Sequence, residues 1–136
     1  ATITTNQRSI SSDEYFVGMF ETALHSNEII TKISFPIPDK SSYIKFPNPA
    51  SRYAMVGVFM AQTGNKVNVA ITGASENGVF RSSEIENALT ANFTLESIDG
   101  LNISSDGLIS DIHASSSYRA NLIKEMAKRA LKEIIT

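Results

Sequence analysis

The sequence predicts an α+β domain, an antiparallel sheet of three to four strands with helices packed on one face. Three observations favour this class. Strand-like segments fill the first half of the chain, helical segments follow them, and a turn joins the two best strands into a hairpin. Strands followed by helices, rather than alternating with them, are typical of an α+β sandwich.

Composition limits the possible functions of this chain. Its 136 residues suffice for one domain with its own core, and a hydrophobic fraction of 42% argues against disorder. A net charge of −2 gives no electrostatic reason to expect nucleic acid as a partner. No apolar stretch approaches the roughly 20 residues of a membrane span. The absence of cysteine excludes an iron–sulfur cluster held by this chain and fits a cytoplasmic location.

The first third of the chain favours short elements. Residues 3–10 are expected to form a short extended pair. Ser11 or Ser12 can then cap a helical turn that begins at Asp13, with acids at its positive end. Residues 28–35 contain three isoleucines and are followed by a proline, so they are predicted to form a strand.

The middle of the chain contains the clearest strands. Residues 42–46 form a short predicted strand, and residues 53–61 and 66–72 form a hairpin around a four-residue turn. In the last of these strands, branched apolar residues alternate with polar or small ones, which indicates one buried face. Residues 73–78 are expected to form a loop, because two glycines enclose polar residues.

Helices are expected after this loop. Ser82 or Ser83 can cap one helix, and residues 93–98 can form a second, short one. Residues 116–135 carry apolar side chains at a four-residue step, which is typical of a helix with one buried stripe. The basic residues of this helix are expected mostly on the other face, as a solvated surface or a docking face for a partner subunit. They are Arg119, Lys124, Lys128, Arg129 and Lys132.

Catalytic groups are sparse in this sequence. Asp111, His113 and Ser115 have the residue types of a hydrolytic triad, but neighbours in one segment rarely let the histidine bridge the other two groups. A loop that ends in a helix cap is the favoured interpretation. No ligand spacing for a metal is present, so neither a metal site nor a catalytic residue is assigned.

One loop is of greater interest. Lys45 ends a predicted strand and precedes two prolines, which restrict the backbone and hold Lys45, Arg52 and Tyr53 in a fixed relation. Cations beside an aromatic ring suit an electron-rich planar ligand, although a plain surface loop would also explain these residues.

The same loop carries a resemblance to a known family. Tyr43-Ile44-Lys45-Phe46 and the following residues 48–59 resemble the C-terminal domain of the medium, FAD-binding subunit of carbon monoxide dehydrogenase and xanthine dehydrogenase-type molybdenum hydroxylases. Five further segments agree in order and spacing: residues 16–24, 27–36, 69–74, 81–89 and 111–122. The resemblance covers nearly the whole chain.

This resemblance implies a function in electron transfer. It implies a domain that helps to enclose FAD, which passes electrons from iron–sulfur clusters to an acceptor. Lys45 matches a lysine near the flavin, and Arg52 and Tyr53 fall in the loop that approaches the ring system. The family often has an acidic residue where Arg52 stands. By resemblance, Asp111, Ser115, Tyr118 and Arg119 hold structural positions.

The resemblance also implies an organisation and a set of partners. Residues 1–10 match the tail of a preceding FAD-binding domain, and residues 11–136 match the C-terminal domain. The expected partners are the FAD-binding N-terminal region of the same subunit, an iron–sulfur small subunit and a large subunit with the molybdenum cofactor. We expect this chain by itself to be inactive and not to bind FAD tightly. The alternative is a stand-alone interaction or ligand-binding module without redox activity.

Overall fold

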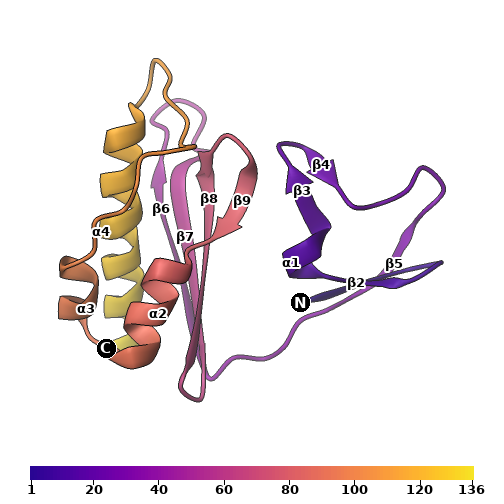
Figure 1. Cartoon of the computed structure of the whole chain (residues 1–136), viewed down its shortest axis with the longest axis horizontal. Coiled ribbons are helices and arrows are strands. Elements are labelled where there is room, and N and C mark those ends of the chain that lie inside the picture. The colour runs from indigo at the N-terminus through magenta and orange to yellow at the C-terminus, as the bar shows by residue number, and fades with distance from the viewer. The chain divides into compact units, whose positions relative to one another are not determined.

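A computed structural model of the chain describes all 136 residues. Two compact units form, Ala1–Ile37 and Pro38–Thr136, and each is described by itself (Figure 1). The break in compactness lies after Ile37, so residues 1–10 and 11–37 share one unit. The division at residue 10 remains a prediction about the family's domain boundary.

The first unit is built on a small three-stranded sheet with the order β2-β1-β5 and antiparallel pairing throughout. Its core consists of Ile3, Ile10 and Tyr15. Ser11 caps the short helix by accepting from the backbone N–H of Asp13, as predicted. The elements are β1 (Thr2–Thr5), β2 (Ser9–Ser11), α1 (Ser12–Tyr15), β3 (Phe16–Gly18), β4 (Glu21–Thr22) and β5 (Ile30–Ser34).

The second unit contains an antiparallel sheet of four strands in the order β6-β7-β8-β9. The predicted hairpin is its centre, and β7 and β8 turn at Gly64, whose φ of +56° is one that glycine adopts without strain. The strands are β6 (Lys40–Pro47), β7 (Ala54–Thr63), β8 (Lys66–Ser75) and β9 (Gly78–Arg81). The loop predicted for residues 73–78 is too long, because β8 continues to Ser75 and β9 begins at Gly78, which leaves a turn at Glu76 and Asn77.

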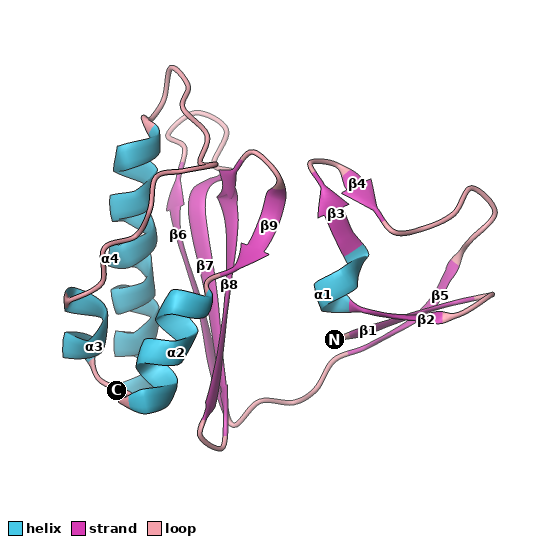
Figure 2. Ribbon diagram, viewed as in Figure 1, coloured by secondary structure: helices cyan, strands magenta, loops and turns pink.

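Three helices lie on one side of this sheet, as Figures 1 and 2 show. They are α2 (Ser83–Ala91), α3 (Leu95–Asp99) and α4 (Ser116–Ile135). The long helix α4 packs on β6 and β7, and α2 packs on β8. Ser82 and Ser115 cap α2 and α4 through their side chains. The predicted α+β class, with a sheet of up to four strands and helices on one face, is therefore confirmed.

The main core lies between the sheet and these helices. Val56, Val58 and Met60 of β7 are fully buried, and so are Ile123 and Leu131 of α4. The apolar stripe predicted for the last helix therefore faces the sheet. Burying a side chain of this size contributes roughly 1.5–3 kcal/mol, which makes this layer the main source of stability in the second unit.

The basic face predicted for α4 is wrong for three of its members. Arg119 is buried, with 4% exposure. Lys128 pairs with Asp99, and Lys124 donates to the backbone carbonyls of Asp99 and Leu101. Only Arg129 and Lys132 belong to the exposed class. Lys124 and Lys128 hold the end of α3 and the following loop against α4. The spacing of residues along α4 could not reveal these contacts.

Candidate functional site

The candidate site lies on the face of the sheet opposite the helices. Alternate residues of a strand point to opposite faces, and Phe46 of β6 meets the ring of Tyr118 on α4 edge to face. Ser42, on the same face as Phe46, donates to Glu133 of α4. Tyr43 and Lys45 therefore point away from the helices.

A pocket of about 520 Å³ forms on this face at the end of the strands. That volume lies within the roughly 300–1,000 Å³ of small-molecule sites. The lining contains two cations, two tyrosines, two smaller hydroxyls and no carboxylate. The residues are Tyr43, Lys45, Ser51, Arg52, Tyr53, Ala54, Thr72 and Gly73.

Lys45 is held at the edge of this pocket. Its Nζ donates to the backbone carbonyl of Arg52 at 3.1 Å. An ammonium has three N–H donors, so two remain for a ligand. The lysine therefore has a fixed position and an exposed charge.

The loop from Asn48 to Tyr53 closes on itself through its backbone. The N–H of Asn48 donates to the carbonyl of Tyr53 at 2.7 Å, and the N–H of Arg52 donates to the carbonyl of Asn48 at 2.9 Å. The Asn48 side chain also accepts from the backbone N–H groups of Ala50 and Ser51. These bonds make the loop a single compact turn.

Arg52 occupies a strained backbone conformation in this turn. Its φ is +64°, in the left-handed region that favours glycine. A non-glycine residue there costs of order 1–3 kcal/mol, and such residues cluster at ligand sites. The side chains of Arg52 and Tyr53 are exposed beside the pocket, with Tyr53 at 80% exposure.

A glycine in β7 lies between two side chains that line the pocket. A Cβ on Gly57 would lie 2.5 Å from the hydroxyl oxygen of Tyr43 and 2.9 Å from Cγ2 of Thr72. Both distances are too short for real contacts. Gly57 therefore lets side chains from the two neighbouring strands approach each other across β7.

The structure brings the three predicted binding residues, Lys45, Arg52 and Tyr53, to one pocket. Sequence reasoning missed Tyr43, Thr72 and Gly73. Tyr43 could have been found, because it lies two residues before Lys45 and so on the same strand face. Thr72 enters through strand pairing, because Gly57 of β7 lies opposite Lys45 on one side and opposite Thr72 on the other, and Gly73 follows Thr72.

The residues of the apparent triad have structural roles. Asp111 Oδ1 accepts from the backbone N–H groups of His113 and Ala114 at 2.9 and 3.0 Å. Its Oδ2 accepts from Arg119, and these bonds, the two from the backbone first, hold the pKa of Asp111 below its usual value. Ser115 caps α4 by accepting from the backbone N–H of Tyr118. The expected helix cap is confirmed.

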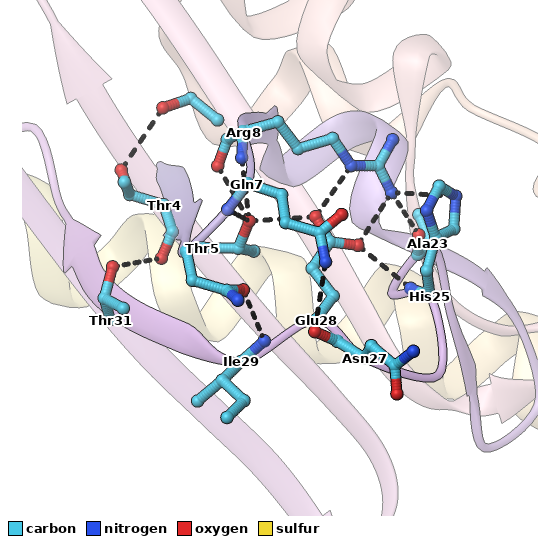
Figure 3. Close-up of polar contacts among 12 residues, drawn as sticks. Thr4, Thr5, Gln7, Arg8, Ala23, His25, Asn27, Glu28, Ile29 and Thr31 are labelled. Carbon is cyan, nitrogen blue, oxygen red and sulfur yellow. Dashed lines mark hydrogen bonds and ion pairs between the residues drawn. The ribbon is translucent and has the colours of Figure 1, made fainter.

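A second polar cluster lies in the first unit, around Glu28 (Figure 3). The Glu28 carboxylate accepts from the guanidinium of Arg8, from the hydroxyl of Thr5 at 2.8 Å and from the backbone N–H of His25 at 2.9 Å. Arg8 above all, followed by the His25 N–H, lowers the pKa of Glu28 to about 2. A carboxylate so stabilised in its charged form is a poor general base at neutral pH. This cluster therefore holds the fold of the first unit.

No group of three or more His, Asp or Glu side chains converges as a metal site would require. None of the helices has the length and apolar character needed to cross a membrane.

Similar proteins are known, although no protein-family model matches the sequence. The nicotine 6-hydroxylase medium subunit of Paenarthrobacter nicotinovorans is 28% identical over 93% of this chain and 48% of its own length. The glyceraldehyde dehydrogenase medium chain of Sulfolobus acidocaldarius is also 28% identical, over 93% of this chain and 49% of its own. The carbon monoxide dehydrogenase medium chain of Hydrogenophaga pseudoflava is 25% identical over 92% of this chain and 47% of its own length.

Solved structures share the fold. Quinoline 2-oxidoreductase from Pseudomonas putida 86 superposes with a TM-score of 0.71 and 20% identity, over 98% of this chain and 50% of that chain. The Cu,Mo-CO dehydrogenase superposes with a TM-score of 0.70 and 19% identity, over 98% of this chain and 51% of that chain. The chain spans about half the length of the curated relatives it matches. Over more than nine-tenths of its length the chain is therefore similar to about half of each of these three medium subunits.

Proposed function

We propose that this chain is the C-terminal domain of the FAD-carrying medium subunit of a molybdenum hydroxylase, and that its pocket faces the ring system of FAD. The observation that carries the proposal is the pocket of Lys45, Arg52 and Tyr53 on the sheet face opposite the helices. Homology to medium subunits over more than nine-tenths of the chain supports it.

The chemistry of the pocket fits this cofactor. A flavin ring system is planar and electron-rich at its carbonyl edge, and the pocket offers N–H and O–H donors without a carboxylate to repel it. When bound, FAD supplies the redox chemistry, taking electrons from iron–sulfur clusters and passing them to an acceptor. This chain supplies position and electrostatics.

Each predicted residue has a definite part in this proposal. The ammonium of Lys45, held by the Arg52 carbonyl, directs its remaining N–H groups at the ligand and adds a fixed positive charge. The guanidinium of Arg52 adds a second cation on a strained loop. The exposed ring of Tyr53 offers an aromatic face for stacking.

The proposal includes partners that provide the other walls of the site. The pocket is open, so this chain by itself would hold FAD weakly. The FAD-binding N-terminal region of the same subunit would close it, and an iron–sulfur small subunit and a molybdenum large subunit would complete a cytoplasmic enzyme. In the first unit, considered by itself, several large apolar side chains are exposed. They include Phe20 at 100%, Ile37 at 93%, Phe35 at 73% and Ile29 at 69%.

The test uses the complete natural polypeptide that contains this chain. Its sequence is expected to carry two glycine-rich FAD-binding segments before residue 1, and the purified polypeptide is expected to show flavin absorbance. The adjacent genes should encode a cysteine-rich small subunit and a large molybdenum subunit. A complete polypeptide without glycine-rich segments or bound flavin would overturn the proposal and favour the stand-alone binding module.

A further inference from the structure

Arg119 is a buried cation in the first turn of α4, on the helix-covered side of the sheet. Its side chain is 4% exposed. Nη1 donates to the backbone carbonyls of Met55 at 2.7 Å and of Gly73 at 3.0 Å, and Nη2 donates to Asp111 at 2.9 Å. One guanidinium thus joins two strands of the sheet to the loop that precedes α4.

Both carbonyls lie where the strand pairing is irregular. Val56 pairs with Phe46 and Ala54 pairs with Pro47, so Met55 is passed over in the pairing between β6 and β7. Between β7 and β8 the pairing runs from Thr63 and Lys66 to Gly57 and Thr72, and so stops before Gly73. A bulge leaves backbone groups without their ladder partners, and buried carbonyls require a donor. Arg119 supplies that donor at both positions.

Met55 and Gly73 lie in or next to the residues that line the pocket. Gly73 lines the pocket, and Met55 follows Ala54, which also lines it. Gly73 has a φ of +79° and lies against the Ala54 carbonyl. The loop from Asn48 to Tyr53, with Arg52 in it, leads directly into Ala54. A shift of Met55 or Gly73 would therefore move the start of β7 and the loop joined to it.

The hydrogen bonding of Arg119 is incomplete. Its Nε is buried without a hydrogen-bond partner. A buried polar group left unsatisfied lowers stability, so Arg119 is not placed for stability alone. The geometry of the two carbonyls, rather than net stability, is thus the property that this arginine most directly controls.

We infer that Arg119 is a positioning residue for the pocket, which fixes the ends of β7 and β8 and thereby the loop that carries Arg52 and Tyr53. It acts from the helix side and touches no ligand. The expected effect on flavin binding rests on the proposed function, whereas the expected effect on the loop does not.

The test measures hydrogen exchange in the loop, at amides that do not touch Arg119. The N–H groups of Asn48 and Arg52 bond within the loop. Arg119→Met should accelerate their exchange by about tenfold or more, since local opening becomes easier. Exchange at the far end of the hairpin, such as at Val67, should remain as in the wild type, and Arg119→Lys should restore part of the protection because it keeps a donor near the carbonyls.

Lys128→Met is the matched control, because it breaks another ion pair of α4, with Asp99, away from the pocket. It should leave the Asn48 and Arg52 amides unchanged. Unchanged loop exchange in Arg119→Met would overturn the inference. So would equal acceleration at the loop and at Val67, since that result means a general loss of stability.

Flavin affinity in the complete subunit separates this inference from the proposed function. Arg119→Met should weaken FAD retention, and Lys128→Met should not. Faster loop exchange with unchanged FAD retention would support the positioning role and overturn the placement of flavin at this pocket.

Discussion

Gly73 of β8 lies against the backbone carbonyl of Ala54 at the start of β7. A Cβ built on Gly73 would be 2.3 Å from the Ala54 oxygen, far inside van der Waals contact. Its φ of +79° also belongs to the left-handed region. The close approach of two backbones, both lining the pocket, therefore requires glycine at residue 73.

Gly73→Ala should destabilise the second unit by about 2–4 kcal/mol, because backbone strain and overpacking add. Chemical denaturation measures this loss. Gly64→Ala is the matched control: its φ is +56°, but a Cβ there meets nothing within 4 Å. It should cost about 1 kcal/mol from strain alone. Equal losses in the two variants would show that the contact with Ala54 is relieved at little cost.

Arg52→Gly should stabilise the isolated chain. Glycine removes the left-handed strain at φ +64°, a gain of up to about 1 kcal/mol after its greater freedom in the unfolded state is counted. Arg52→Ala keeps the strain and removes the same cation, so it should show no such gain in a denaturation experiment. A destabilised Arg52→Gly variant would mean that the guanidinium contributes more to the fold than its exposure indicates.

Lys45→Met should lower the midpoint potential of the flavin in the complete subunit. A nearby cation stabilises the more negatively charged reduced state, so its loss favours oxidised flavin. We expect a shift on the order of 10–30 mV, since about 30 mV corresponds to about 1.4 kcal/mol for a two-electron couple. Spectroelectrochemical titration measures it. Lys66→Met, at the opposite end of β8, is the control. An equal shift in both variants, or none in either, would contradict a flavin beside Lys45.

Glu28 should make the first unit sensitive to acid. Its pKa in the fold is about 2, below the usual 4.5, because Arg8 above all, and then the backbone N–H of His25, stabilise its charged form. A group with a depressed pKa binds protons more readily in the unfolded state, so its contribution is complete above about pH 5. That contribution is lost as the pH falls from about 4.5 to 2.

Glu28→Gln should lower the stability of the first unit at pH 7 and flatten its loss between about pH 4.5 and 2. The pH dependence of amide exchange at Ile3 and Ile10, which form the core of this unit, measures both effects. Glu21→Gln, on the exposed strand β4, should leave the profile unchanged. A steep acid loss that persists in Glu28→Gln would assign it to another group.

Local signals made much of the fold predictable. The four-residue apolar step predicted the last helix, and the turn between two strand-like segments predicted the hairpin of β7 and β8. Lys45, Arg52 and Tyr53 were grouped because prolines confine the short stretch that holds them. The strand β9 was missed because its four residues give too short a pattern, and pairing with β8 stabilises it.

Non-local contacts account for what the sequence left open. Arg119 was expected on the exposed face with the other basic residues, yet it is buried and donates to the carbonyls of Met55 and Gly73, at two irregular strand positions. Thr72 reaches the pocket because it pairs with Gly57 of β7, and Gly73 follows it in the chain. Such contacts depend on how strands and helices pack, and the identity of a residue does not reveal them.

The sequence by itself determined the class of the fold, its principal elements and a proline-held turn with two cations and an aromatic ring. These properties depend on the local backbone and on the period of apolar residues. The tertiary structure decided which face of the sheet the helices cover, which side chains from other strands join the turn, and that Arg119 bonds to the strand ends from the helix side. The physical reason is that buried carbonyls and close backbone approaches are satisfied by residues distant in sequence, which only the folded chain brings together.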